Sequence, residues 1–337
     1  MSTLKKLYYD ACSLLLTRLF RSGGPSRLLL PYHHTVSNHL LPHLAHLYSY
    51  KNEHQFEADL DYLLKNFKVV SPDVIASAVS NREPLPKGSF LLTFDDGFRE
   101  VNDIIAPLLQ KKGVPAIFFI NPDFIDNKQL FYRCKISILI GELKKNSGYA
   151  KVYAAILQAP HMVVEQLIES LKKITQLNAH ILDRIAEEIG YSFQNFLEQQ
   201  QPFLTRGQLT SLDKSGFTIG AHSMNHPYYN LLPQNEQVRQ TLDSCNYVKE
   251  LLNSKICHFS FPHSDAPVLQ STIDLINEQN EGLLFGIQNQ KQETANRVLH
   301  RFNAERPEIN IDVLVKGQIL MNSLQKASGS FRIIRKK

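Results

Sequence analysis

Short apolar runs alternate with segments of helical periodicity over most of the chain, which is the pattern of an α/β protein. Most of the apolar runs are continuous, as expected for a parallel sheet that is covered on both faces. They predict strands at residues 28–32, 68–70, 90–94, 116–120, 217–221, 256–261, 283–287 and 298–302. Apolar positions three and four residues apart predict helices at 53–65, 101–112 and 235–252. Gly113 is the expected C-terminal cap residue of the second helix.

The middle of the chain has a different pattern. Between residues 126 and 201 no segment has convincing strand character, whereas 162–174 and 178–189 are amphipathic helical patterns. Asn178 is the expected N-cap of the second helix, and Gly190 follows its expected end. Because the α/β pattern resumes directly afterwards, we expect a helical insertion rather than an independent domain. Such insertions lie in loops and can line or cover a site.

The first 27 residues predict an N-terminal helical segment. Several apolar residues share one helical face: Leu4, Leu7, Tyr8, Leu15, Leu19 and Phe20. Asp10 and Arg18 interrupt the apolar stretch and no small-residue cleavage site follows, unlike in a signal peptide. No apolar run is long enough for a transmembrane helix. We expect a helix docked on the domain, with a peripheral membrane-surface helix as the alternative.

Composition narrows the class of protein. With 337 residues, 43% hydrophobic and 20% charged, the chain is neither wholly disordered nor fibrous. The net charge of +5 is not concentrated in a basic stripe, so we expect no nucleic-acid partner. The four cysteines, Cys12, Cys134, Cys245 and Cys257, have neither disulfide-framework nor zinc-site spacing. Without an export signal, we expect a cytoplasmic protein, with peripheral membrane contact through the N-terminal helix as an option.

The strongest local signal is a pair of carboxylates at the end of a predicted strand. Asp95 and Asp96 directly follow an apolar run, and Gly97 allows the backbone to turn sharply after them. Adjacent like charges at a strand end are costly unless a cation or proton offsets them. Catalytic groups in α/β folds gather at the carboxyl ends of strands. A solvated turn is the simpler interpretation of these three residues alone.

A second signal follows the strand at 217–221. His222 and His226 are spaced so that both imidazoles can reach one metal ion. The chain has 13 histidines, so this pair alone is weak evidence. Combined with an aspartate at another strand end, it predicts an open Asp/His/His site for a divalent metal. The remaining aspartate would be free to act as a base.

These stretches resemble the first two motifs of the polysaccharide deacetylases, also called the NodB-homology family or carbohydrate esterase family 4. The flanking residues 113–120 and 209–221 resemble that family as well. The resemblance implies a distorted (β/α) barrel of about seven strands, metal-dependent hydrolysis of acetyl groups on sugars, and roles for four residues. It implies Asp95 as general base and Asp96, His222 and His226 as metal ligands. The implied organisation is an N-terminal segment 1–27, a barrel 28–125 and 202–305, a helical insertion 126–201 and a C-terminal segment 306–337.

The third motif departs from the family pattern. The matching stretch is 259–264, where the arginine is missing and His263 stands in the place of a tyrosine. The resemblance implies that the backbone N–H at this position helps to hold the oxyanion, which a side-chain change does not remove. Arg99 is one candidate to pair with Asp95, although a solvated helix start is the simpler interpretation of Arg99.

The last family motif has no clear match, because His300 closes a strand without the aspartate that should follow. A subgroup that acts on poly-N-acetylglucosamine carries the corresponding histidine near the N-terminus, after a strand ending in Tyr-His. Residues 28–34 resemble that arrangement. We therefore favour His33 as the general acid over His34 and His300. The histidines His39, His43, His46 and His54 are expected in a loop near the site rather than on the metal.

The resulting prediction is a metal-dependent hydrolase that removes N-acetyl groups from a glycan or glycan precursor. Zinc is the expected metal, with cobalt or nickel as alternatives, and an acetylated carbohydrate is the expected partner. Two other functions stay open: an inactive glycan-binding barrel, and a hydrolase of O-acetyl esters or other amides on the same fold.

Overall fold

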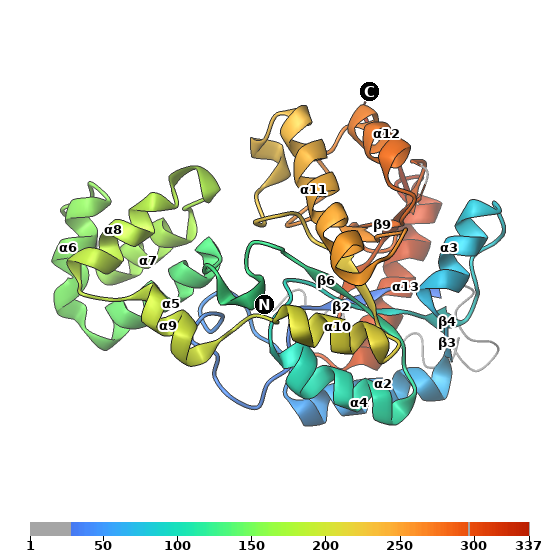
Figure 1. Cartoon of the computed structure of the whole chain (residues 1–337), viewed down its shortest axis with the longest axis horizontal. Coiled ribbons are helices and arrows are strands. Elements are labelled where there is room, and N and C mark those ends of the chain that lie inside the picture. The colour runs from blue at the N-terminus through green and yellow to red at the C-terminus, as the bar shows by residue number, and fades with distance from the viewer. Residues whose placement is uncertain (1–27, 296, 337) are drawn as a thin grey trace.

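The computed structural model describes residues 28–295 and 297–336, which build a barrel with a group of helices beside it (Figure 1). The main sheet has eight strands in the order β11-β9-β8-β7-β6-β5-β2-β12, and every pair in it is parallel. Its strands are β2 (Pro31–His33), β5 (Leu92–Phe94), β6 (Ala116–Ile120), β7 (Thr218–Ala221), β8 (Phe259–Ser260), β9 (Leu284–Gly286), β11 (Val298–His300) and β12 (Phe302–Asn303). The α/β class predicted from the apolar runs is confirmed.

The sheet closes on itself at Arg301. This residue separates β11, which pairs with β9, from β12, which pairs with β2. The two edges of the sheet are therefore consecutive pieces of one strand, so the eight segments occupy seven positions around the barrel. The prediction of a distorted (β/α) barrel of about seven strands is confirmed.

Helices cover the outside of the barrel. Around it lie α2 (Glu53–Asn66), α3 (Pro72–Ser80), α4 (Ala106–Lys112), α10 (Arg206–Lys214), α11 (Gln234–Leu252), α12 (Gln270–Gln279) and α13 (Ile311–Ala327) (Figure 1). Side chains set the helix starts: Asn52 and Gln55 form a capping box for α2. Gly113 ends α4 in the left-handed conformation, as its sequence position predicts.

Small sheets lie outside the main one. One joins β1 (Leu28–Leu29), β4 (Ser89–Phe90) and β3 (Lys68–Val69), and another joins β10 (Gln292–Glu293) to β13 (Arg332–Ile333). The predicted strand 256–261 is shorter in the structure, where β8 has two residues. Its first part is held by side chains instead, because Asn280 donates to the Cys257 carbonyl and the His258 imidazole accepts from the N–H of Leu283.

The segment between β6 and β7 is helical and has a core of its own. It forms α5 (Tyr132–Lys145), α6 (Ala150–Ile156), α7 (Val164–Lys172), α8 (His180–Glu188) and α9 (Phe193–Gln200), the green group at the left of Figure 1. Phe98 and Phe203 stack where this segment joins the barrel. Both belong to the apolar cluster of the inserted helices. Gly190 ends α8 as predicted, but Asn178 is not its N-cap. The Asn178 side chain instead accepts the N–H of Thr175 and closes a preceding 3₁₀ turn.

The C-terminal helix α13 belongs to the packing of the barrel, because Ile311, Leu314 and Val315 lie in the main core. The residue bounds of the four predicted parts of the chain stay a prediction. Cys134, Cys245 and Cys257 are buried and form no disulfide with one another. Cys12 and the predicted helix of residues 1–27 lie outside the described residues. Among the described helices, none has the length and apolarity that crossing a membrane requires.

Candidate active site

Asp95 and Asp96 lie in the turn that follows β5, at the carboxyl end of the barrel. Both carboxylates are almost fully buried, at 3% and 5% exposure. Asp96 and Gly97 have positive φ values of 73° and 65°, so the chain turns away immediately after the strand. A side chain at Gly97 would meet the Ile120 methyl at 3.1 Å. This turn needs glycine for both its conformation and its close contact with β6.

The two predicted metal-binding histidines follow β7, two strand positions from β5. Ser223 and His226 have positive φ values of 65° and 58°, an uncommon conformation that often accompanies functional sites. Asn121 fixes this loop, because its side-chain amide donates to the carbonyls of His222 and Ser223. The Ser223 hydroxyl in turn accepts the N–H of His226 at 3.1 Å.

Asp96, His222 and His226 converge on one point. Their ligand atoms lie within 4.8 Å of one another. The Nε2 atoms of His226 and His222 lie 3.2 and 3.5 Å from Oδ1 of Asp96. Burial lowers the pKa of His222 to about 4 despite the opposing charge of Asp95, which keeps its imidazole neutral. One carboxylate and two imidazoles fit a divalent transition metal.

The far side of each of these two imidazoles is also held by a contact. Nδ1 of His222 donates to the Ser260 carbonyl at 2.7 Å. Nδ1 of His226 lies 3.2 Å from Nε2 of His263. With a proton on each Nδ1, both Nε2 atoms present a lone pair toward Asp96. Metal-binding histidines are usually oriented in this way.

Asp95 is paired with Arg301, the residue at which the barrel closes. The guanidinium donates to both carboxylate oxygens at 2.8 Å and also contacts Thr93 and Ser260. Burial alone would raise the pKa of Asp95, but the charge of Arg301 holds this pKa below its usual range. Arg99, weighed from the sequence for this contact, pairs instead with Asp103. Arg301, rather than Arg99, is therefore the arginine that pairs with Asp95.

The structure does not bring His33 into the site. Its imidazole is buried between Phe56 and Phe94, and neither ring nitrogen has a hydrogen-bond partner among the described residues. Successive side chains of a strand point to opposite faces, so Tyr32 and His34 face the carboxyl-end pocket while His33 faces α2. The choice of His33 as general acid is contradicted by this position.

His34 occupies the place expected of the acid. Its Nδ1 donates to Glu305 at 2.7 Å, and Glu305 also accepts the N–H groups of His34 and Thr35. Burial by itself would lower the pKa of His34, but the Glu305 carboxylate raises it to about 9. His34 is therefore a cation at neutral pH, beside Asp95 and Asp96.

His263 lies beside the metal ligands, with a positive φ of 56°. The ring of Tyr228 stacks on its imidazole at a centroid distance of 3.6 Å, and the Tyr132 hydroxyl lies 3.3 Å from Nε2. Burial, with a smaller effect from His226, strongly lowers the pKa of His263, so the ring is neutral and can accept a hydrogen bond. The backbone N–H of His263 makes no hydrogen bond within the described chain. It remains available as an oxyanion donor.

These residues surround a cavity of about 210 Å³. The cavity is lined by Tyr32, His34, Leu44, Leu47, Tyr48, Asp95, Asp96, Phe98, Phe131, Arg133, His222, His226, Phe261, His263 and Ile287. The loop around residue 45 thus lies near the site, as expected, but His54, which we expected in the same loop, lies in α2. His43 from that loop packs on Phe98 and Phe196, away from the metal ligands.

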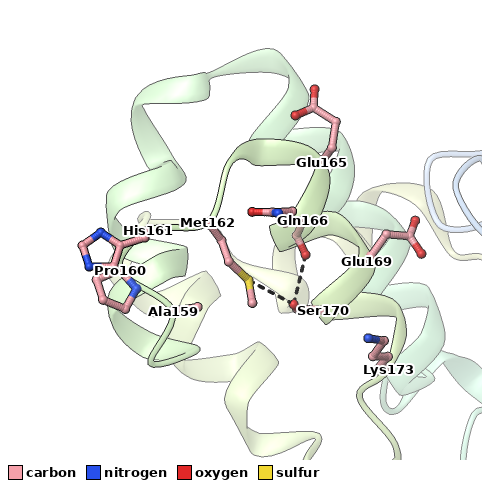
Figure 2. A pocket seen from close by; sticks show the side chains of 9 residues that line it. All are labelled: Ala159, Pro160, His161, Met162, Glu165, Gln166, Glu169, Ser170 and Lys173. Atoms are coloured by element: carbon pink, nitrogen blue, oxygen red, sulfur yellow. Dashed lines mark hydrogen bonds between the residues drawn. The ribbon is translucent and has the colours of Figure 1, made fainter.

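Two other features of the molecule lie apart from the motif residues. A more open cavity of about 650 Å³ lies on the insertion beside α7, where Ser170 donates to Met162 and to the Gln166 carbonyl (Figure 2). It contains none of the motif residues. His300 lies in a buried cluster with Asp265 and Glu293, where Arg335 pairs with both carboxylates. His300 is therefore not the general acid that would act together with Asp95.

The comparison with known protein families covers the site residues described above. A sequence model of the polysaccharide deacetylase family matches residues 82–279, which include both aspartates and both metal-binding histidines. The chain belongs to the polysaccharide deacetylase family. The prediction made from the two motifs is confirmed, and the protein is a hydrolase of this deacetylase class. No curated protein sequence matches the chain.

Solved structures of deacetylases share the fold. Deacetylase PplD of Streptococcus pyogenes, in complex with acetate, is 15% identical with a TM-score of 0.55 and covers 87% of this chain and 99% of its own. IcaB of Ammonifex degensii is 18% identical with a TM-score of 0.55 over 88% and 98%. A de-N-acetylase of Aggregatibacter actinomycetemcomitans is 14% identical with a TM-score of 0.55 over 86% and 99%. At these levels of sequence identity, the similarity shows a shared fold only.

Sequence reasoning missed Arg301, Glu305 and the residues that the insertion adds to the pocket. Arg301 and Asp95 are 206 positions apart, and His34 and Glu305 are 271 apart. At these separations, neither pair forms a motif within a short stretch of sequence. The one available signal was that Arg301 lies within a predicted strand, at residues 298–302.

Proposed function

We propose that this polysaccharide deacetylase is metal-dependent and removes N-acetyl groups from a glycan or glycan precursor. The observation that supports this most is the convergence of Asp96, His222 and His226 in a buried pocket beside Asp95. Zinc is the metal that this ligand set suits best, with cobalt or nickel as alternatives. When bound, such an ion polarises the acetyl carbonyl and lowers the pKa of a water molecule.

Asp95 is the general base in this proposal. Its pKa is held low, so the carboxylate is ionised at neutral pH and can take a proton from the attacking water. Arg301 occupies one side of both carboxylate oxygens. The fork-shaped contact fixes the orientation of Asp95 while leaving its other lone pairs free.

His34 is the general acid, in place of His33. An amide nitrogen leaves only when protonated, and the imidazolium of His34 supplies that proton from the end of β2, the strand next to β5. Because its pKa is raised, the imidazole of His34 carries the proton before the leaving nitrogen takes it. This feature favours an N-acetyl amide over an O-acetyl ester, because an alkoxide depends less on protonation to leave. The backbone N–H of His263 stabilises the oxyanion that forms during attack.

The test combines metal content with acetate release. We expect about one metal per chain after reconstitution with zinc, and acetate release from an N-acetylglucosamine oligomer. Asp95→Asn should keep the metal and lose turnover, whereas His226→Ala should lose both. An O-acetylated sugar tested in parallel distinguishes an esterase. Acetate release that is unchanged after complete metal removal would contradict the proposal, as would full activity of Asp95→Asn.

A further inference from the structure

A second cavity, of about 690 Å³, adjoins the catalytic pocket. The two share four lining residues, His34, Leu47, Tyr48 and Arg133. The rest of the second cavity is formed by Ser49, Asn303, Glu305, Arg306, Pro307 and Glu308. A substrate that places its acetyl group beside Asp95 therefore has room to extend past Arg133.

Arg133 has no carboxylate partner. It lies in the first turn of α5, half-buried, and its Nη1 donates to the Tyr228 hydroxyl at 3.0 Å. Within residues 28–295 and 297–336, no carboxylate oxygen lies within 4.0 Å of its guanidinium. Lys135 and Lys145 of the same helix both have such partners, Asp183 and Glu142. A guanidinium has five N–H donors, so Arg133 keeps most of its donors for a ligand.

The charges around this cavity favour an anion. Glu305 is already committed, since it accepts from the imidazole of His34 and from two backbone N–H groups. Glu308 is exposed at the rim, whereas Arg133 and Arg306 both line the cavity. With His34 protonated, three cationic side chains face two carboxylates. The fork of an arginine matches the two oxygens of a phosphate or carboxylate group.

We propose that the second cavity binds an anionic group of the substrate, a phosphate ester or a carboxylate on the sugar chain, and that Arg133 recognises it. This inference rests on the proposed function, because it takes the acetyl group to lie beside Asp95. It makes the substrate an acidic or phosphate-linked glycan rather than a neutral polymer. The insertion, through the first turn of α5, then determines which glycan is deacetylated.

The test uses three matched substrates with zinc-loaded enzyme. They are the N-acetylglucosamine tetramer, the same tetramer with a 1-phosphate, and its aldonic acid with a terminal carboxylate. We expect at least tenfold higher kcat/KM for one or both anionic forms, through a lower KM that rises with added salt. The comparison of the phosphate and carboxylate forms identifies the group that is preferred. Equal kcat/KM for all three substrates would overturn the inference.

The variants separate recognition from a structural effect. Arg133→Gln should lower the anionic-to-neutral ratio of kcat/KM at least tenfold, and Arg133→Lys should lower it less. The control Lys135→Gln removes a charge two residues away on the same helix, and it should leave the ratio unchanged. If Arg133→Gln lowers kcat/KM equally for all substrates, its role is to hold Tyr228 and His263, and the inference is wrong.

Calorimetry makes the result independent of turnover. Asp95→Asn should bind the tetramer phosphate or the aldonic acid at least tenfold more tightly than the neutral tetramer. If no substrate releases acetate but this preference is found, the proposed function fails and the anion site stands. Equal binding of all three would reject the anion site whether or not the enzyme turns over.

Discussion

His33 and His34 are neighbours in the sequence with opposite environments. The imidazole of His33 is enclosed by Phe56 and Phe94, and burial with the nearby Lys51 lowers its pKa well below the usual range. Glu305 instead holds His34 as a cation at the pocket wall. One histidine is therefore a neutral core residue, and the other is a cation at the pocket wall that we propose as the proton donor. The strand alternation is the origin of the difference, because it turns only His34 toward Glu305 and the pocket.

This contrast gives a paired prediction. His34→Gln should lower turnover by about 100-fold or more, the usual contribution of a general acid. His33→Gln should lower the free energy of unfolding, because an amide with more hydrogen-bonding groups than a neutral imidazole is buried without a partner, yet leave turnover of the folded enzyme nearly unchanged. Acetate release per bound zinc checks both variants. A larger turnover loss in His33→Gln than in His34→Gln would reverse the assignment.

Glu305 sets the pH range in which His34 is protonated. The pKa of His34, about 9, predicts an alkaline limb in the pH profile of kcat at or below that value, since a bound cation lowers it. Glu305→Gln should move this limb to lower pH by at least about one unit, the usual size of a carboxylate effect. A limb at the same pH in both enzymes would show that His34 does not control it.

The same pair contributes to stability with a defined sign. The pKa of His34 is raised on folding, so the stabilisation is fully present below the unfolded value of about 6.5. It is lost as pH rises through about 9. Urea unfolding of the wild type and of Glu305→Gln across this range should therefore converge at high pH.

At the scale of elements, the junction of β11 and β12 joins barrel closure to catalysis. Arg301 is fully buried where the strand changes partner from β9 to β2, and it holds Asp95 at the end of β5. Removing one member of a buried ion pair leaves an uncompensated charge. The strand that closes the barrel thus also positions Asp95, the proposed base.

Arg301→Met should lower the free energy of unfolding by roughly 3–5 kcal/mol. It should also move the acid limb of the kcat profile to higher pH, because the largest effect that opposes the burial of Asp95 is then lost and the pKa of Asp95 rises. The surface variant Arg99→Met should cost about 1 kcal/mol or less. The double variant Arg301→Met/Asp95→Asn should recover much of the stability. If it is no more stable than Arg301→Met, the cost does not come from the unpaired carboxylate.

Elements were more predictable from the sequence than the directions of their side chains. The turns after β5 and β7 carry local motifs, and parallel strands bring their carboxyl ends to one edge. The run at 28–32 is apolar throughout, so no alternation indicated which histidine faces the barrel interior. Arg301 and Glu305 act across more than 200 residues of sequence. Their contacts depend on barrel closure, which no local pattern encodes.

At the scale of the whole molecule, the site is assembled from parts that are distant in sequence. The helical insertion separates Asp96 from His222, and it adds Phe131 and Arg133 to the pocket wall. The loop around residue 45 contributes Leu44, Leu47 and Tyr48 to the same wall. An intact set of metal ligands therefore exists only in the folded chain.

Metal binding should accordingly stabilise the whole fold. At a free zinc concentration of one hundred times Kd, linkage predicts a gain of about 2.7 kcal/mol in the free energy of unfolding. Urea titrations with zinc and with a chelator measure this gain. Asp95→Asn should keep it, because Asp95 is not a ligand, while His222→Ala should lose most of it. A wild type that unfolds at the same urea concentration with and without zinc would show that these residues do not form a folded-state metal site.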